Sequence, residues 1–325
     1  MRALKTVAVA ALGTMTLLVA SCGEDAAADS ADRTTAVEHT YGTTTIYGTP
    51  TRIVAGTSQW VDALLEFGVQ PVAYHSGADR GDERGLFPWQ SDVAADAVEL
   101  EASASTMSLP VEQIAAQTPD LILGSYTVTT RSDFDKLSQI APTVPALGDA
   151  QVDEWEDQVT VLGEILGQQD RANEIITEAN ADIDALADRL PGLQGKTAAL
   201  AQYMFSTNQI IVVADPDDGA SSVFERLGMS VPRALVDEAG ATGGRLTLSP
   251  ERVDALTADL VVMLPNGGSA EQLNALPGFV DLPAVREGGL AVVDYPTVVG
   301  FNTPSATSVR YSLDRITPQL EAVAN

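Results

Sequence analysis

Apolar positions along the chain alternate between two spacings. Short continuous apolar runs are typical of buried strands, and apolar residues three or four places apart are typical of helices. The runs that predict strands lie at residues 52–56, 71–74, 120–123, 143–147, 197–201, 210–213, 259–264 and 290–294. Helical spacing follows the first run, with Trp60, Leu64 and Phe67 before Gly68. Strands that alternate with helices predict parallel βαβ units.

Two longer helices are predicted in the middle of the chain. One runs from about Val152 to Leu166 and ends at Gly167. The other runs from about Asp170 to Leu190, where Pro191 and Gly192 stop it. At ~1.5 Å per residue, the second helix would be ~30 Å long, which is enough to reach across a small lobe.

The chain contains an internal repeat. Residues 109–123 can be laid over residues 248–262 without a gap, and six of the fifteen positions are identical. Both copies read as a cap, a helix, a turn and a buried strand. Because the charged and cap positions match as well as the apolar ones, the repeat predicts two structurally related lobes.

The start of the chain has the layout of a secretory signal. Arg2 and Lys5 precede an apolar run, which is too short to span a membrane, since a span needs ~20 apolar residues. The phrase LVASC, which ends at Cys22, resembles the lipobox of bacterial lipoproteins, whose cysteine takes a diacylglyceryl group. We therefore expect a signal peptide at residues 1–21 and a lipidated, flexible tether at residues 22–36.

Charge and cysteine content exclude several classes of protein. With residues 1–21 removed, 45 acidic residues face 16 basic ones, and the net charge is −29. Such a chain is repelled by nucleic acid, so we expect no nucleic-acid partner. Cys22 is the only cysteine, so neither an intrachain disulfide nor a cysteine metal cluster can form.

Five phrases, in this order, resemble the ferric-siderophore and cobalamin group of ABC-transporter substrate-binding proteins. They are residues 50–54 (PTRIV), 62–72 (DALLEFGVQPV), 112–122 (EQIAAQTPDLI), 137–144 (LSQIAPTV) and 282–288 (LPAVREG). The resemblance runs from about Tyr41 to the C-terminus.

The resemblance implies an α/β fold of two lobes, each with a mainly parallel sheet flanked by helices, joined by one long helix. This is the class III periplasmic-binding-protein fold. We expect an N-terminal lobe at residues 37–168, a connecting helix at 169–192 and a C-terminal lobe at 193–325. A single helix resists hinge motion, so ligand capture should involve only small lobe closure.

The resemblance also implies a partner. In the family, one glutamate on each lobe docks onto arginines of an ABC permease dimer, and Glu112 and Glu251, matched in the internal repeat, fit that pattern. Charge pairs of this kind set orientation and encounter rate. A purely structural role, favouring a helix N-terminus, is the alternative for both.

The ligand cleft should lie at the carboxyl ends of the strands, where loops of both lobes meet. Aromatic and arginine side chains there suit a bulky metal chelate. The candidates in these loops are Trp89, Tyr126, Arg131 and Tyr203, followed by Arg80 and Arg84. Packing under a long loop is an alternative for Trp89, and a solvated helix start is one for Arg131.

The leading hypothesis is a monomeric lipoprotein on the extracytoplasmic face of the cell membrane. It would deliver a ferric siderophore to an importer without chemistry, a cofactor or a protein ligand to iron. Cobalamin or haem remains an alternative ligand, and an exported hydrolase using His75 or a surface adhesin remains an alternative class. His39 and His75 are the only histidines, which disfavours a bare zinc or manganese site. The loop from Asp215 to Gly219 lacks the glycine and glutamate spacing of a calcium loop and should be a helix-capping turn.

Overall fold

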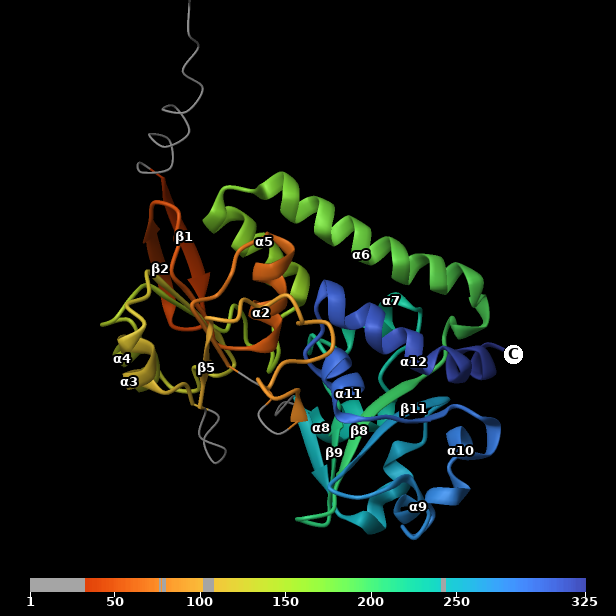
Figure 1. Ribbon diagram of the computed structural model, residues 1–325. Helices are drawn as coiled ribbons and strands as arrows, with labels where there is room; N and C mark the ends of the chain where they lie inside the picture. Colours follow the sequence, from red (N-terminus) through yellow and green to blue (C-terminus); the bar gives the residue numbers. More distant parts are fainter. Residues whose placement is uncertain (1–32, 76, 78–79, 102–107, 241–243) are drawn as a thin grey trace, which may run out of the picture.

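A computed structural model describes residues 33–75, 77, 80–101, 108–240 and 244–325. The predicted signal peptide, Cys22 and residues 23–32 of the predicted tether lie outside the described residues. Residues 34–36 of that tether belong instead to the first strand, β1 (Thr34–His39), so the folded part begins earlier than predicted. The described chain forms two α/β lobes that lie under one long helix (Figure 1).

The N-terminal lobe is built on a five-stranded, all-parallel sheet of order β5-β4-β3-β6-β7. Its strands are β3 (Ile53–Ala55), β4 (Ala73–His75), β5 (Val98–Leu100), β6 (Leu121–Ser125) and β7 (Thr143–Pro145). Its helices are α2 (Ser58–Glu66), α3 (Val111–Ala116), α4 (Arg131–Leu137) and α5 (Trp155–Leu166). An antiparallel hairpin of β1 (Thr34–His39) and β2 (Gly42–Tyr47) precedes it.

The C-terminal lobe is built on a five-stranded sheet of order β10-β9-β8-β11-β12. Its strands are β8 (Ala198–Met204), β9 (Gln209–Val213), β10 (Arg245–Leu248), β11 (Leu260–Asn266) and β12 (Leu290–Val292). Its helices and 3-10 helices are α7 (Ser222–Arg226), α8 (Arg233–Ala239), η4 (Pro250–Leu256), α9 (Ala270–Leu273), η5 (Phe279–Asp281), α10 (Pro283–Glu287), α11 (Tyr295–Asn302) and α12 (Ala306–Ala324).

This second sheet is mixed, because β9 runs antiparallel to both of its neighbours. Only a short turn separates β8 from β9, and a parallel pairing needs a crossover connection of a dozen or more residues. The expectation of alternating βαβ units therefore holds for the N-terminal sheet except between β4 and β5, where the described residues form no α-helix, and it fails at β9 in the C-terminal sheet.

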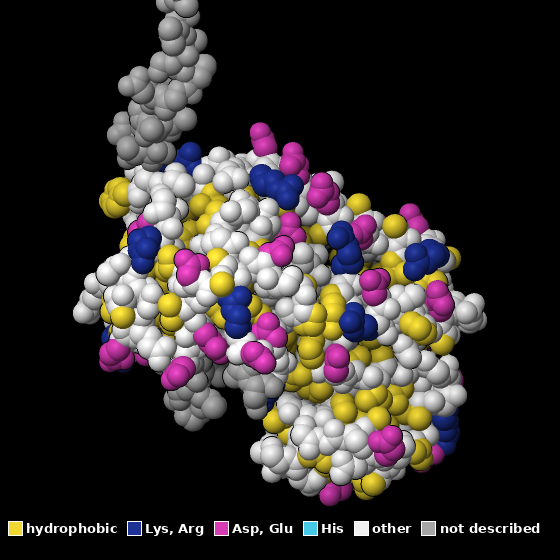
Figure 2. All heavy atoms as spheres, in the orientation of Figure 1, with side chains coloured by type: hydrophobic (Ala, Val, Ile, Leu, Met, Phe, Trp, Pro, Cys, Tyr) yellow, Lys and Arg dark blue, Asp and Glu magenta, His cyan; other side chains and the backbone are white. Residues whose placement is uncertain are grey.

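The connecting helix α6 (Gln169–Arg189) matches the predicted helix to within a residue at each end, and η2 (Pro191–Leu193) follows it. Its apolar stripe divides between the lobes. Ala172, Ile175 and Ala179 belong to the N-terminal core, and Ile183 and Leu186 belong to the C-terminal core. On the face drawn in Figure 2, acidic and basic side chains are interspersed along α6. One continuous helix therefore anchors both lobes and exposes its polar side.

The internal repeat reflects equivalent positions in the two lobes. Its first copy leads into β6 and its second into β11, and each is the fourth strand of its sheet. The matched aspartates make the same contacts: Asp120 accepts bonds from the Thr51 backbone N–H and hydroxyl, and Asp259 from those of Thr197. Each carboxylate thereby fixes the start of the first strand of its sheet.

Helix α5 starts three residues later than predicted. The Val152 carbonyl accepts a bond from the Gly219 N–H of the other lobe at 3.0 Å, instead of opening a helical turn. The Asp153 carboxylate accepts bonds from the Leu147 N–H and the Ser125 hydroxyl. These contacts hold the segment in a non-helical conformation until Trp155.

Candidate binding site between the lobes

A cavity of about 50 Å³ lies between the C-terminal sheet and α11. Its lining combines apolar side chains with a few polar ones. It is lined by Leu200, Ala201, Gln202, Ile211, Val213, Arg245, Tyr295, Val298, Val299 and Asn302. Small-molecule sites are usually ~300–1,000 Å³ and combine an apolar lining with a few placed polar groups. This cavity has the lining of such a site, but it is too small for a siderophore-sized ligand unless its rim moves.

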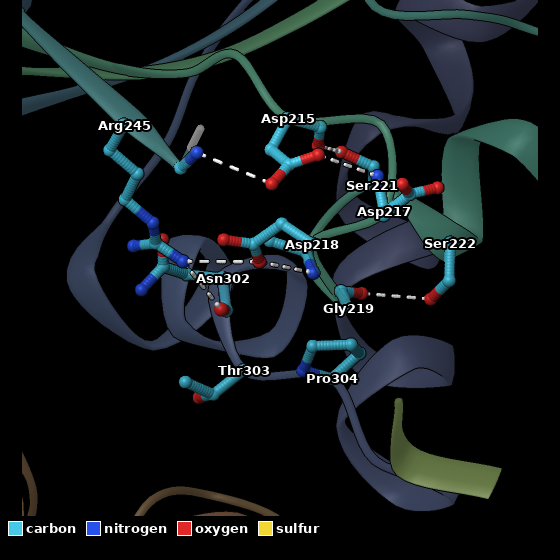
Figure 3. A network of polar contacts seen from close by, with 12 residues as sticks. Asp215, Asp217, Asp218, Gly219, Ser221, Ser222, Arg245, Asn302, Thr303 and Pro304 are labelled. Carbon is cyan, nitrogen blue, oxygen red and sulfur yellow. Dashed lines mark hydrogen bonds and ion pairs between the residues drawn. The ribbon is translucent and has the colours of Figure 1, made fainter. Parts of the chain in front are cut away.

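Arg245, the first residue of β10, is the only charged residue among those that line the cavity. Its side chain is 13% exposed, and its guanidinium lies 3.5 Å from the fully buried carboxylate of Asp218. The same guanidinium donates to the Asn302 side-chain oxygen at 2.6 Å and to the Asn302 carbonyl (Figure 3). Its Nε has no partner among the described residues.

The N-terminal lobe supplies two of the predicted residues to the rim of this cavity. The Arg80 guanidinium donates to the Tyr295 hydroxyl at 3.0 Å and lies 4.6 Å from the centre of its ring. Tyr126, directly after β6, interacts electrostatically with Tyr295 and Arg245, and burial raises the pKa of its phenol to about 12. Arg80 and Tyr126 of the N-terminal lobe thus interact with residues that line the cavity, although every lining residue belongs to the C-terminal lobe.

Trp89 lies at the junction of the lobes, beside this rim. Its ring stacks on Phe87 and packs at 4.9 Å against Tyr311 of α12. Its Nε1–H donates to the Asp62 carboxylate of α2 at 2.9 Å. The side chain therefore packs between the lobes, and it connects to the cavity through Phe87, whose ring centre is 6.4 Å from that of Tyr295.

Asp62 holds this junction together. Its carboxylate, 2% exposed, accepts bonds from Trp89, from the Gln90 amide at 2.6 Å and from the Ser305 hydroxyl at the start of α12 at 2.5 Å. Burial raises the pKa of Asp62 to about 7, although these three hydrogen bonds favour the charged form.

The structure does not bring three other candidates to the cavity. The Arg84 guanidinium donates to the Val93 and Ala94 carbonyls and closes its own loop. Arg131 is exposed at the start of α4, where it pairs with Asp135. Tyr203 is 3% exposed and donates to Asn208.

The position of Tyr203 follows from strand geometry. Successive side chains of a strand point to opposite faces of its sheet. Along β8, Leu200, Ala201 and Gln202 line the cavity, whereas the side chain of Tyr203 packs in a core cluster of the C-terminal lobe. The prediction for Tyr203 assumed the wrong face of β8.

Comparison with known proteins identifies the family of this chain. A model of the periplasmic binding protein family matches residues 86–296, which is more than half of the chain. The chain belongs to the periplasmic binding protein family. The resemblance inferred from the five phrases is thereby confirmed, and the family consists of substrate-binding proteins.

Relatives and solved structures of this family agree with the fold. The probable siderophore-binding lipoprotein YfiY of Bacillus subtilis is 26% identical over 299 residues, covering 88% of each chain. The structure of PiaA of Streptococcus pneumoniae in complex with ferrichrome has a TM-score of 0.73 at 22% identity, covering 89% of this chain and 98% of that one. SirA of Staphylococcus aureus with staphyloferrin B has a TM-score of 0.71 at 21% identity, covering 89% and 98%. These likenesses confirm the class III periplasmic-binding-protein fold.

In this family fold, Glu112 and Glu251 occupy matching places. Glu112 lies in the first turn of α3 and Glu251 in the first turn of η4, and both are exposed. A hydrogen bond from Ser249 lowers the pKa of Glu251, which favours its charged form. Each acid stands at the start of the helix that leads into the fourth strand of its sheet.

The remaining sequence candidates have local roles. The loop from Asp215 is a turn, as expected: the Ser221 hydroxyl donates to the Asp215 carbonyl, and α7 begins at Ser222 (Figure 3). The His75 Nδ1 is buried without a hydrogen-bond partner among the described residues. Within the same residues, no cluster of three metal-ligating side chains occurs, and no helix is both long and apolar enough to cross a membrane.

Proposed function

We propose that this chain is the substrate-binding lipoprotein of an ABC importer, and that it captures a ferric siderophore between its lobes. The observation that carries the proposal is the meeting of polar side chains from both lobes beside the apolar lining of the cavity. Arg80 and Tyr126 come from the N-terminal lobe, and Arg245, Tyr295 and Asn302 come from the C-terminal lobe. Such a site offers hydrogen-bond donors to an oxygen-rich chelate and apolar contact to its organic rim.

The similar proteins support this ligand class. YfiY is named as a probable siderophore-binding lipoprotein, and PiaA and SirA were solved with ferrichrome and staphyloferrin B. A siderophore surrounds its iron completely, so the protein needs to recognise only the chelate. The chain then performs capture and delivery without catalysis and without a resident cofactor.

Delivery is proposed to occur by docking of Glu112 and Glu251 onto the permease dimer. Their exposure and their matching places in the two lobes support a symmetric pair of contacts. Exposed charge pairs steer encounter and orientation more than they add affinity.

Cys22 is proposed as the lipid attachment site that holds a monomer on the extracytoplasmic face of the membrane. The lipobox phrase and the short polar segment after it support an anchor with a tether. YfiY is itself named as a lipoprotein.

A fluorescence titration of the full chain tests the ligand. Trp89 lies beside the site, whereas Trp60 and Trp155 are fully buried. We expect ferric siderophores to quench emission with micromolar affinity or better, and Trp89→Phe to remove most of the signal while binding persists by calorimetry. If haem or cobalamin binds and no ferric siderophore does, the proposed ligand is wrong and the molecule that binds takes its place. Binding of none of them would overturn the proposal.

A further inference from the structure

We infer that the site selects an uncharged or cationic ferric chelate, of the tris-hydroxamate class, over a polyanionic chelate such as a tris-catecholate. The inference rests on the proposed function and names the ligand class for the same site. The names of similar proteins do not choose between classes, because their ligands differ. The charged side chains at the cavity favour one of these ligand classes.

The arginine of the cavity is already neutralised by the protein. Arg245 lies 3.5 Å from Asp218, and the exposed fractions of the two side chains are 13% and 0%. An arginine positioned to neutralise an anionic ligand would keep its charge available. Here a polyanion would instead approach a buried carboxylate, and like charges brought together at a desolvated site oppose binding.

Asp218 is fixed in place by its own loop. Its Oδ1 accepts from the Ala220 N–H at 2.9 Å, and its carbonyl accepts from the Ser221 N–H at 2.7 Å (Figure 3). The next residue, Gly219, contacts Val152 of the other lobe. The carboxylate cannot turn away from Arg245 without breaking this loop.

The atoms that remain available suit a neutral, polar ligand. Arg245 Nε and Asp218 Oδ2 are both buried without a hydrogen-bond partner among the described residues. They offer one donor and one acceptor, which match a carbonyl or hydroxamate oxygen and an amide N–H or ammonium group of a chelate.

The rim adds little positive charge. Among the described residues, Arg80 is the one cation at the rim, and its guanidinium already donates to the Tyr295 hydroxyl and stacks over the Tyr295 ring. Tyr126 stays a neutral donor, since the pKa of its phenol is about 12. Three hydroxamates balance the charge of Fe(III), whereas three catecholates leave three negative charges. Arg80 alone does not offset three negative charges, so the site fits the neutral chelate better.

The test compares Fe(III) chelates of different charge on the full chain by calorimetry. The probes are a cyclic tris-hydroxamate without charge, a linear tris-hydroxamate with a free amine, and a tris-catecholate. We expect either hydroxamate to bind at least roughly tenfold more tightly than the tris-catecholate, which corresponds to ~1.4 kcal/mol. Asp218→Asn, which frees the charge of Arg245, should raise affinity for the tris-catecholate roughly tenfold and change that for the neutral chelate little.

Asp217→Asn is the matched control, because Asp217 is exposed on the same loop and bonds through its backbone to Asp215. It removes the same unit of charge and should leave the ranking unchanged. Tighter binding of the tris-catecholate by the wild-type chain overturns the inference, even if Asp218→Asn fails to fold. So does an equal effect of the two substitutions. Binding of no ferric chelate overturns the proposed function instead, and the inference with it.

Discussion

Asp62→Asn should change the pH dependence of stability. The Asp62 carboxyl is buried between α2 and α12, and it receives hydrogen bonds from Trp89, Gln90 and Ser305 but no ion pair from a described cation. Glu66, one turn along α2, adds negative charge nearby. The folded protein therefore favours the protonated form, and the pKa of Asp62 rises from 3.8 to about 7.

The size of the effect follows from linkage. Between these two pKa values the unfolded chain loses its proton while the folded chain keeps it, so stability falls as pH rises toward about 7. Each pH unit is worth ~1.4 kcal/mol, so the wild type should lose about 3 kcal/mol between about pH 5 and pH 8 through this group. An asparagine cannot ionise and removes this loss, at a pH-independent cost of about 1 kcal/mol for one hydrogen bond.

Urea unfolding followed by circular dichroism at about pH 5 and pH 8 measures this difference. Asp62→Asn should be more stable than wild type by about 3 kcal/mol at the higher pH, and the two proteins should be within about 1 kcal/mol of each other at the lower pH. Glu154, whose pKa is also raised to about 7 by burial, is present in both proteins and cancels in the comparison. Asp188→Asn, an exposed change on α6, serves as the control. A difference between variant and wild type that is the same at both pH values would refute the reasoning.

Three further substitutions test the seam between the lobes, the docking acids and the anchor. Gly219→Ala places a Cβ 2.5 Å from the Asp153 carbonyl oxygen. It should therefore destabilise the protein by about 1–3 kcal/mol in thermal melts and weaken ligand binding in titrations. Gly148→Ala, which has open space around its Cβ, is the control and should have neither effect. Glu112→Ala with Glu251→Ala should keep chelate affinity and abolish uptake of radiolabelled iron by cells; surviving uptake would make these acids structural only. Cys22→Ser should release the protein from membranes on fractionation without loss of affinity, and an unreleased variant would show a different attachment.

Much of the fold could be predicted because its signals are local and repeated. The stripe of α6 and the repeat that ends in Asp120 and Asp259 depend on residues close together in the sequence, and both are found in the structure. Strand β9 was predicted at residues 210–213, but its antiparallel direction was missed, although the few residues between it and β8 carry that information.

The site could be predicted only where a loop follows a strand. Tyr126 and Arg80 were predicted by that rule, and the structure places both against residues of the other lobe; their role in binding stays a prediction. Arg245 was missed because it begins a strand, and the residues that make it part of the site, Asp218 and Asn302, are far from it in sequence. Its one local signal is an isolated charge that opens the otherwise uncharged strand β10.

The contacts between the lobes indicate which part of the molecule must move when a ligand enters. The α6 helix is anchored in both cores, Ser305 is bonded to Asp62, and Gly219 is bonded to Val152, so the lobes are held at three separate places. The cavity of about 50 Å³ must nevertheless enlarge to admit a chelate. The contact of Arg80 with Tyr295 closes its rim, and Arg80 is exposed, so breaking this contact desolvates nothing. We therefore expect the rim to open first at Arg80, and the lobes to separate only slightly around a helix that resists bending.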